Sequence, residues 1–230
     1  MKLNSSTKVE DLGSSPNIAN AMLGAVPSEV FNEDCITVMK RYPDKFFDLA
    51  VVDPPYGLGD KLTQGGTWAS KYAKGDASWD IAPPAEYWEQ LFRVSKNQIV
   101  WGANYFTEYL PASMGWIFWD KGQDLSMSDG ELAYTSFNRA LRRVKINRGQ
   151  LMVEGGTIHP TQKPIKLYDW IIQNYCAEAN LILDTHVGSG SSRIAAAKAG
   201  KQFIGFEIDP EYYEKQEKRF NDFKSQLRLF

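Results

Sequence analysis

The chain has 230 residues, of which 43% are hydrophobic and 23% are charged, and its formal net charge is -2. This length suits one substantial α/β domain rather than two. A net charge so close to zero argues against a polyanion-binding surface spread over the whole molecule. The two cysteines, Cys35 and Cys176, lack a C-x-x-C or metal-ligand spacing, which favours reduced thiols and a cytoplasmic location. No apolar run approaches the ~18 residues of a membrane span, and no signal-peptide core is present.

Apolar periodicity predicts alternating strands and helices after an N-terminal arm at 1–28. That arm is rich in Ser, Asn, Gly and Pro and lacks sustained periodicity. Residues 120–158 are polar and match neither pattern. We expect a single α/β domain over 29–230, with a mostly parallel sheet. Its predicted strands are 30–34, 47–52, 98–101, 116–119, 181–184 and 203–208, and its predicted helices are 35–42, 85–94, 164–178, 193–199 and 211–229.

The tetrapeptide Asp53-Pro54-Pro55-Tyr56 directly follows the apolar strand 47–52. In open α/β sheets, ligands bind at the carboxyl ends of the strands. A carboxylate, the carbonyl of a rigid proline and an aromatic ring at that place suit a planar amino group on a flat ring. The segment therefore predicts an active site at the end of a buried strand.

A second candidate site is the loop Gly188-Ser189-Gly190, which joins strand 181–184 to an alanine-rich helix. Its glycines do not complete G-x-G-x-x-G and no Gly-Lys-Ser/Thr is present, which argues against NAD and against a phosphate-cradling loop. Asp184 would repel a pyrophosphate and favour a cationic ligand, unless it only caps the next helix. Glu207 is placed to accept from both hydroxyls of a ribose. S-adenosylmethionine, a nucleoside with a cationic amino-acid tail, fits these residues.

Taken together, these motifs resemble the DNA amino-methyltransferases, in the permuted order in which the catalytic tetrapeptide precedes the cofactor-binding half. The resemblance covers roughly residues 30–225 and is closest to the small, phage-type members. It implies a Rossmann-like S-adenosylmethionine-dependent methyltransferase fold with helices on both faces of the sheet. It also implies a site-specific enzyme of restriction-modification type that acts on double-stranded DNA and can pair as a homodimer. The implied parts are a catalytic half at 29–119, a small DNA-recognition insert at about 120–158 and a cofactor-binding half at 159–230.

The resemblance also assigns individual residues. The catalytic motif is matched by Asp53, Pro54, Pro55 and Tyr56. Asp34 is expected near the cofactor's adenine, the stretch that begins at His159 near its methionine moiety, and Glu207 at its ribose. His186 stands where the family usually has Phe, and His159 is equally compatible with a turn residue ahead of a proline. The full set of expected cofactor-binding residues is Asp34, Cys35, His159, Thr161, Lys163, Asp184, His186, Gly188, Ser189, Gly190, Glu207 and Ile208.

The expected mechanism follows from the chemistry of an exocyclic amino group. Asp53 and the Pro54 carbonyl each accept one N–H bond, which exposes the nitrogen lone pair and stabilises the positive charge that develops there. Tyr56 stacks on the target base, which has to be flipped out of the duplex. The sulfonium methyl is already activated, so the reaction needs positioning and no metal. Cytosine C5 methylation is disfavoured because neither cysteine has a Pro-Cys context.

The strongest local cluster of positive charge lies at 138–150, which contains no acidic residue. We expect it to neutralise DNA phosphates, so that binding falls with salt; an exposed strand pair with alternating charge is the alternative. Its members are Arg139, Arg142, Arg143, Lys145 and Arg148. Three further cations in the glycine-rich segment 57–80 are expected to close over the DNA or the flipped base: Lys61, Lys71 and Lys74.

The leading hypothesis is an S-adenosylmethionine-dependent, adenine-N6 DNA methyltransferase, because Asp at the first catalytic position favours adenine by family habit. Cytosine-N4 methylation is the nearest alternative, since both targets are exocyclic amino groups. Methylation of a protein glutamine or of an RNA adenine is a further alternative, although such enzymes would be expected to lack the basic insert. A catalytically idle DNA-binding or cofactor-sensing protein on the same fold is disfavoured by the intact catalytic acid and ring.

Overall fold

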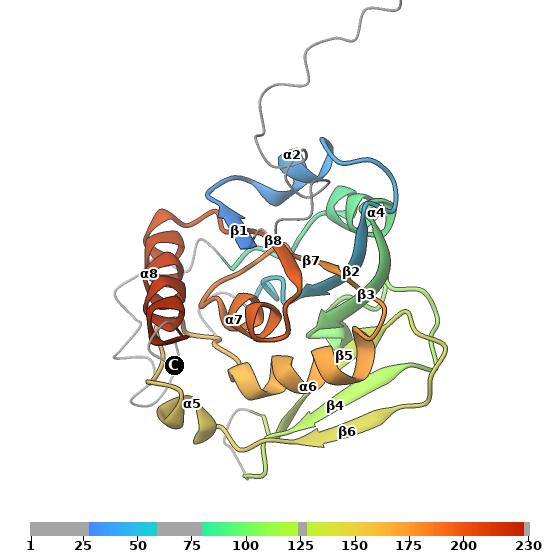
Figure 1. Ribbon diagram of the computed structural model, residues 1–230. Helices are drawn as coiled ribbons and strands as arrows, with labels where there is room; N and C mark the ends of the chain where they lie inside the picture. The colour runs from blue at the N-terminus through green and yellow to red at the C-terminus, as the bar shows by residue number, and fades with distance from the viewer. Residues whose placement is uncertain (1–27, 59–79, 124–127, 228–230) are drawn as a thin grey trace, which may run out of the picture.

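The computed structural model describes residues 28–58, 80–123 and 128–227, apart from the side chain of residue 227. The predicted arm lies outside these residues except for Ser28. Within the described ranges, eight strands form one sheet in the order β1-β8-β7-β2-β3-β5-β4-β6 (Figure 1). In chain order the strands are β1 (Ser28–Phe31), β2 (Phe47–Val52), β3 (Ser95–Trp101), β4 (Trp116–Asp120), β5 (Gly130–Thr135), β6 (Arg142–Lys145), β7 (Leu181–Asp184) and β8 (Gln202–Phe206).

Helices cover both faces of this sheet, as predicted. Leu49 and Val51 of β2 face a core that includes side chains of α6 and α7. Ala50 and Val52, which alternate with them along the strand, face a second core with side chains of α2 and α4. Because β2 is buried on both sides, its sequence is a continuous apolar run after Asp48, as is typical of parallel sheets. The helices are α2 (Cys35–Met39), α4 (Ala85–Val94), α5 (Gln150–Val153), α6 (Ile165–Tyr175), α7 (Ser191–Lys198) and α8 (Pro210–Leu227), with a 3-10 turn η3 (Ala103–Tyr105).

The strand directions decide which residues meet. The pairings from β1 through β8, β7 and β2 to β3 are all parallel. Strand β5 is antiparallel to both β3 and β4, and β6 is parallel to β4. Within the sheet as described, every strand except β5 therefore runs in one direction. Their carboxyl ends share one edge, which also receives the amino end of β5; we call it the carboxyl edge.

Several predicted elements have the predicted bounds, and others differ. Strand β2, helix α4 and strand β7 begin and end where predicted. The strand predicted at 30–34 ends at Phe31, because the Asp34 side chain caps α2 by accepting a hydrogen bond from the Thr37 amide at 2.8 Å. Strand β8 ends at Phe206, so Glu207 follows the strand. The unclassified segment 120–158 contains β5, β6 and α5.

The hydrophobic side chains are concentrated in this sheet and its covering helices. Leu49, Ile99, Ile117 and Phe203 are fully buried, and each such side chain contributes about 1.5–3 kcal/mol relative to exposure. In the ranges that the structure describes, no helix is both long enough and apolar enough to cross a membrane.

Candidate active site

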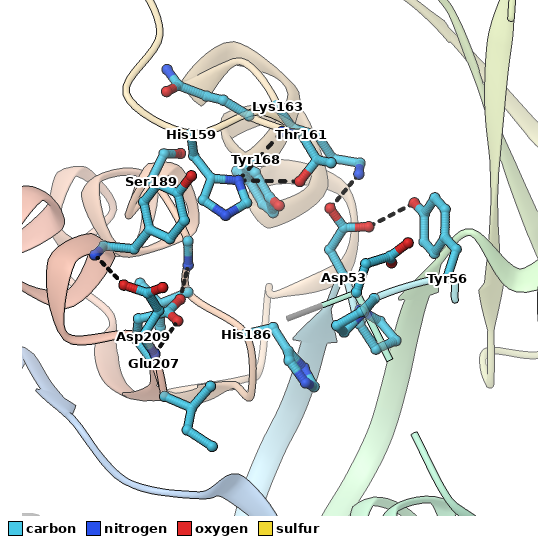
Figure 2. A pocket seen from close by; sticks show the side chains of 18 residues that line it. Asp53, Tyr56, His159, Thr161, Lys163, Tyr168, His186, Ser189, Glu207 and Asp209 are labelled. Atoms are coloured by element: carbon cyan, nitrogen blue, oxygen red, sulfur yellow. Dashed lines mark hydrogen bonds and ion pairs between the residues drawn. The ribbon is translucent and has the colours of Figure 1, made fainter. Parts of the chain in front are cut away.

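A cavity opens at the carboxyl edge, where β2, β7 and β8 end and where the segment before α6 lies across them (Figure 2). It encloses about 780 Å³ including its open mouth. Figure 2 shows Asp53 and Tyr56 on one side and Glu207 and Asp209 on the other. The lining residues are Asp53, Pro54, Pro55, Tyr56, Asp80, His159, Thr161, Gln162, Lys163, Tyr168, His186, Val187, Gly188, Ser189, Glu207, Ile208, Asp209 and Tyr212.

All four predicted catalytic residues line this cavity. Asp53 directly follows β2, and both of its oxygens have partners (Figure 2). The Tyr56 hydroxyl donates to Asp53 Oδ1 at 2.8 Å, and Lys163 Nζ forms an ion pair with Oδ2. Burial raises the pKa of Asp53, and the positive charge of Lys163 opposes that rise. The carboxylate is therefore fixed in orientation by two donors from different parts of the chain.

The Tyr56 ring is held by the turn that follows β3. It stacks on Tyr105 with a centroid separation of 4.7 Å and an interplanar angle of 17°. Gly102 has φ +64°, and a Cβ there would lie 2.1 Å from a Tyr56 ring atom, so this close approach requires glycine. Stacking of Tyr56 on a base stays a prediction, and it requires either the ring face that Tyr105 leaves open or displacement of Tyr105.

Lys163 belongs to a row of four alternating charges that the sequence did not predict. Its ammonium lies 3.0 Å from Glu131 Oε2, and Lys121 Nζ lies 3.0 Å from Glu131 Oε1. The Lys163 side chain is only 3% exposed. The row Asp53–Lys163–Glu131–Lys121 connects the catalytic loop to the start of β5 and the end of β4. Lys163 lines the cavity as expected, but its ammonium contacts the catalytic acid.

Neighbouring charges in this row stabilise one another in their ionised forms. Although burial lowers the pKa of Lys163, the neighbouring Asp53 and Glu131 carboxylates raise it above its ordinary value. Burial likewise opposes ionisation of Glu131, but Lys163 and Lys121 hold its pKa below the ordinary value. Two anions and two cations therefore share a site in which the lysines are buried and the acids partly buried, and each removes part of the desolvation penalty of its neighbour.

On the opposite side of the cavity, Glu207 ties the end of β8 to the glycine loop. Its Oε2 accepts from the Gly188 amide at 2.8 Å, and its Oε1 accepts from the Asp209 amide at 3.0 Å. A carboxylate has about four acceptor positions, so Glu207 keeps capacity for hydroxyl donors. Asp209 in turn accepts from the Tyr212 amide at 3.1 Å at the start of α8. Asp209 and Tyr212 line the cavity and were not predicted.

The stretch that begins at His159 is both a turn and a wall of the cavity. His159 Nδ1 accepts from the Thr161 amide at 3.3 Å, and its ring lies edge-on against Tyr212 at 4.3 Å. Burial lowers the pKa of His159 to about 3, so the imidazole is neutral. Gln162 closes the turn by accepting from the Ile158 amide at 2.9 Å and donating to the Gly156 carbonyl at 3.1 Å. The turn and ligand-contact interpretations of His159 are therefore compatible.

His186 lines the cavity in the place that the resemblance gives to a phenylalanine. Burial lowers the pKa of His186 to about 4, so this ring is also neutral. It packs edge-on against Tyr87 at 5.5 Å, and its Nδ1 lies 2.9 Å from Thr185 Oγ1. A neutral, packed ring can take over the role of an aromatic side chain against a ligand.

Four expected cofactor residues do not line the cavity. Asp34 caps α2, as described above, and burial raises the pKa of the Cys35 thiol beside it to about 12. Asp184 accepts from the Ser192 hydroxyl at 2.5 Å and the His186 amide at 3.0 Å, and burial raises its pKa to about 7. These contacts agree with the local, helix-start interpretation of Asp184. Gly190 has φ +74° and packs against Gln216 of α8.

The five cations at 138–150 do not form one patch. Arg139 donates to the Asn174 carbonyl at 2.6 Å and lies over the Tyr175 ring, at the end of α6. Arg143 pairs with Asp120. Arg142, Arg143 and Lys145 are exposed on β6, as in the alternating-strand interpretation, and Arg148 lies between β6 and α5. Lys61, Lys71 and Lys74 lie outside the described residues.

The fold and the cavity define an α/β protein in which two acids, Asp53 and Glu207, face one cavity at the carboxyl edge of the sheet. Comparison with known proteins gives the family: a model described as DNA methylase, of the N6/N4 amino-methyltransferases, matches residues 82–218. This match spans more than half of the chain, so the chain belongs to that family. The matched range begins after the tetrapeptide at 53–56, whose place in the site rests on the geometry above.

Individual relatives agree with the family. The type II methyltransferase M2.MboI of Moraxella bovis is 24% identical over 259 residues, with 86% of this chain and 92% of that protein covered. A crystal structure of the M1.HpyAVI–SAM complex has a TM-score of 0.54 at 18% identity and covers 84% of this chain and 98% of that one. The cytosine-N4-specific PvuII DNA methyltransferase has a TM-score of 0.57 at 14% identity, covering 86% and 89%. These likenesses establish the methyltransferase fold.

S-adenosylmethionine is the cofactor that this family membership assigns to the chain. The residues present fit it, because one cavity offers the buried Glu207 carboxylate, two neutral imidazoles and a glycine loop. Neither cysteine lines the cavity, and burial raises the pKa of both thiols to about 12, which disfavours the thiolate that cytosine C5 methylation requires.

Proposed function

We propose that this DNA methylase transfers a methyl group from S-adenosylmethionine to the N6 amino group of a flipped-out adenine in double-stranded DNA. The observation that carries the proposal is the Asp53 carboxylate, held by two donors at the wall of the cavity that also contains Glu207. An acceptor fixed in this way suits an exocyclic amino group. The preference for adenine rests on Asp at the first position of the tetrapeptide.

Asp53 and the Pro54 carbonyl accept the two N–H bonds of the amino group in this proposal. Holding both hydrogens favours a pyramidal nitrogen, whose lone pair then points at the methyl group. The Asp53 charge stabilises the positive charge that grows on nitrogen, and the same carboxylate is the nearest base for the proton that nitrogen then releases. S-adenosylmethionine supplies the activated methyl group when it is bound.

The cofactor-binding residues in this proposal are the expected ones that line the cavity, except Lys163, whose ammonium contacts Asp53. Glu207 accepts from the ribose hydroxyls, and the neutral ring of His186 packs on the adenine. The turn His159–Thr161 and the backbone of Gly188-Ser189 border the methionine moiety. The proposal gives no direct contact to Asp34, Cys35, Asp184 and Gly190, because none of the four lines the cavity.

We further propose that the insert at 120–158 contacts DNA through the exposed β6. Arg142 and Lys145 project from this edge strand, and Arg148 follows it toward the carboxyl edge. Arg139 is excluded from the proposed surface because it is bonded to α6. Pairing of two chains is likewise a prediction, which sedimentation velocity tests.

The experiment is digestion of treated DNA to nucleosides followed by mass analysis. We expect N6-methyl-2′-deoxyadenosine from the wild type. Asp53→Asn should lose at least about 10²–10³-fold in rate, because an electrostatic contact to the reacting group is removed. Asp44→Asn is the control, since its side chain is 76% exposed. N4-methyl-2′-deoxycytidine would establish cytosine as the target base, and no product would favour a catalytically idle protein. Wild-type rates in Asp53→Ala would overturn the mechanism.

A further inference from the structure

We propose that Lys163 is a positioning residue for methyl transfer, held by Glu131 and acting on Asp53, rather than a ligand of the cofactor. This inference rests on the proposed function, because it needs Asp53 as the acceptor of the amino group. It also assigns supporting roles to Glu131, which lies in β5, and to Lys121, which directly follows β4.

The first argument is the placement of the ammonium. Lys163 forms an ion pair with Asp53 and lies 3.0 Å from Glu131, so two carboxylates already surround it. The ammonium also lies 5.5 Å from the centre of the Trp101 ring, whose face attracts a cation. With the side chain 3% exposed, these neighbours leave the ammonium little freedom to turn toward a bound ligand.

The second argument is the rigidity of the backbone that carries Lys163. Pro164 follows it and precedes α6, with its φ fixed by the ring. Gln162 precedes it and bonds both Ile158 and Gly156, as described above. The side chain is therefore aimed from a stiff turn, which is what a positioning role requires.

The third argument is charge balance around Asp53. Besides Lys163, the described groups that interact electrostatically with Asp53 include Glu131, Asp184 and the phenols of Tyr56, Tyr87 and Tyr168. None of these five brings a positive charge. Without Lys163, two desolvated carboxylates would face each other, and the pKa of Asp53 would rise. Lys163 therefore opposes the rise in the pKa of Asp53 and favours its anionic form, while Tyr56 holds its other oxygen.

Glu131 and Lys121 make this arrangement stable against competition. The carboxylate of the methionine moiety is the anion that could draw Lys163 away from Asp53. Glu131 holds Lys163 from the opposite side and is itself held by Lys121, whose ammonium is 5.4 Å from the centre of the Trp119 ring. A buried pair that is fixed on both sides retains one geometry during turnover.

The test is Lys163→Met, with the exposed Lys166→Met as the matched control. We expect the affinity for S-adenosylmethionine, measured by calorimetry, to change less than about twofold, which is under 0.5 kcal/mol. The rate of methyl transfer at saturating cofactor should fall. The low-pH side of its pH–rate profile, which we call the acid limb, should move up by about one to three pH units, because the cation beside Asp53 is removed. A weakened cofactor affinity with an unmoved acid limb would overturn the proposal.

A second variant separates charge from structure. Lys163→Met/Glu131→Gln removes the repelling carboxylate as well, so its acid limb should move back toward that of the wild type. A merely structural role predicts that the double variant is no better than the single one. Lys163→Arg and Glu131→Gln keep the test decisive if Lys163→Met does not fold. Lys163→Arg should retain the wild-type acid limb, and Glu131→Gln should move it to lower pH or leave it in place.

The outcomes distinguish this proposal from the one on which it rests. Loss of methylation in Asp53→Asn together with an unmoved profile in Lys163→Met overturns the role of Lys163 alone. Full methylation in Asp53→Asn overturns the proposed function and, with it, the role of Lys163.

Discussion

Strands β2 and β6 show how differently the two sides of the sheet are built. Five of the six residues of β2 are buried, and it lies between parallel neighbours. Strand β6 buries only Val144 and exposes Arg142, Arg143 and Lys145. The parallel side thus supplies a rigid edge from which the catalytic acid and Glu207 project. The other side, β5-β4-β6, presents charge outward and sends Glu131 and Lys121 inward to the same edge.

The largest expected difference between the two sides is in stability. Leu49→Ala in β2 removes a fully buried side chain and should lower the free energy of unfolding by about 2–5 kcal/mol. Leu141→Ala, the same chemical change just before β6, affects a side chain that is 57% exposed and should change it by at most about 0.5 kcal/mol. Urea unfolding measures both. Similar values for the two variants would contradict the contrast between the sides.

The next effect concerns two acids that the family resemblance places at the cofactor. Glu207→Gln should weaken S-adenosylmethionine binding about tenfold or more, because a charged acceptor at the cavity is removed. Asp34→Asn should leave this affinity unchanged, because Asp34 caps α2 outside the cavity wall. Calorimetric titration distinguishes them. If Asp34→Asn weakened binding as strongly, the adenine would have to lie beside α2.

A smaller, salt-dependent effect is expected at the edge strand. Charge reversal of Arg142 and Lys145 should weaken DNA binding and make the slope of log affinity against log salt shallower by about 0.9 for each phosphate that is no longer neutralised. Arg139→Gln is the control within the same cluster, and it should leave the slope unchanged, because Arg139 is bonded to Asn174. Fluorescence anisotropy at several salt concentrations gives the slopes. An unchanged slope after the double reversal would remove β6 from the DNA surface.

The smallest expected effect is that of the helix cap. Asp34→Ala removes the acceptor of the Thr37 amide and should lower the free energy of unfolding by about 1 kcal/mol. Methylation rate at saturating cofactor should stay at the wild-type level. A loss of rate without a loss of stability would show that Asp34 contributes to the active site.

The parallel side of the sheet is easier to predict from the sequence than the side formed by β5, β4 and β6. Strands β2 and β7 are apolar runs that lead into an acid, so their bounds and the place of Asp53 follow from local pattern. Strand β5, Gly-Glu-Leu-Ala-Tyr-Thr, buries only its second half and gives no clear alternation. Glu131 could not be predicted because its role depends on β5 pairing with β3, which no local signal indicates. Lys163 is predictable as a cavity residue, but its contact with Asp53 is set by tertiary structure.

The reversed direction of β5 makes the register of one strand pair part of the catalytic centre. Glu131 lies opposite Trp119, and this pairing aims its carboxylate at Lys163. Successive side chains of a strand point to opposite faces, so a slip of one residue would aim Gly130 or Leu132 there instead. A one-residue insertion within β5 would thus change the charge next to Asp53 without touching the tetrapeptide. The chemistry of the active site therefore depends on the alignment of two strands that contact neither the methyl donor nor the acceptor base in the proposed mechanism.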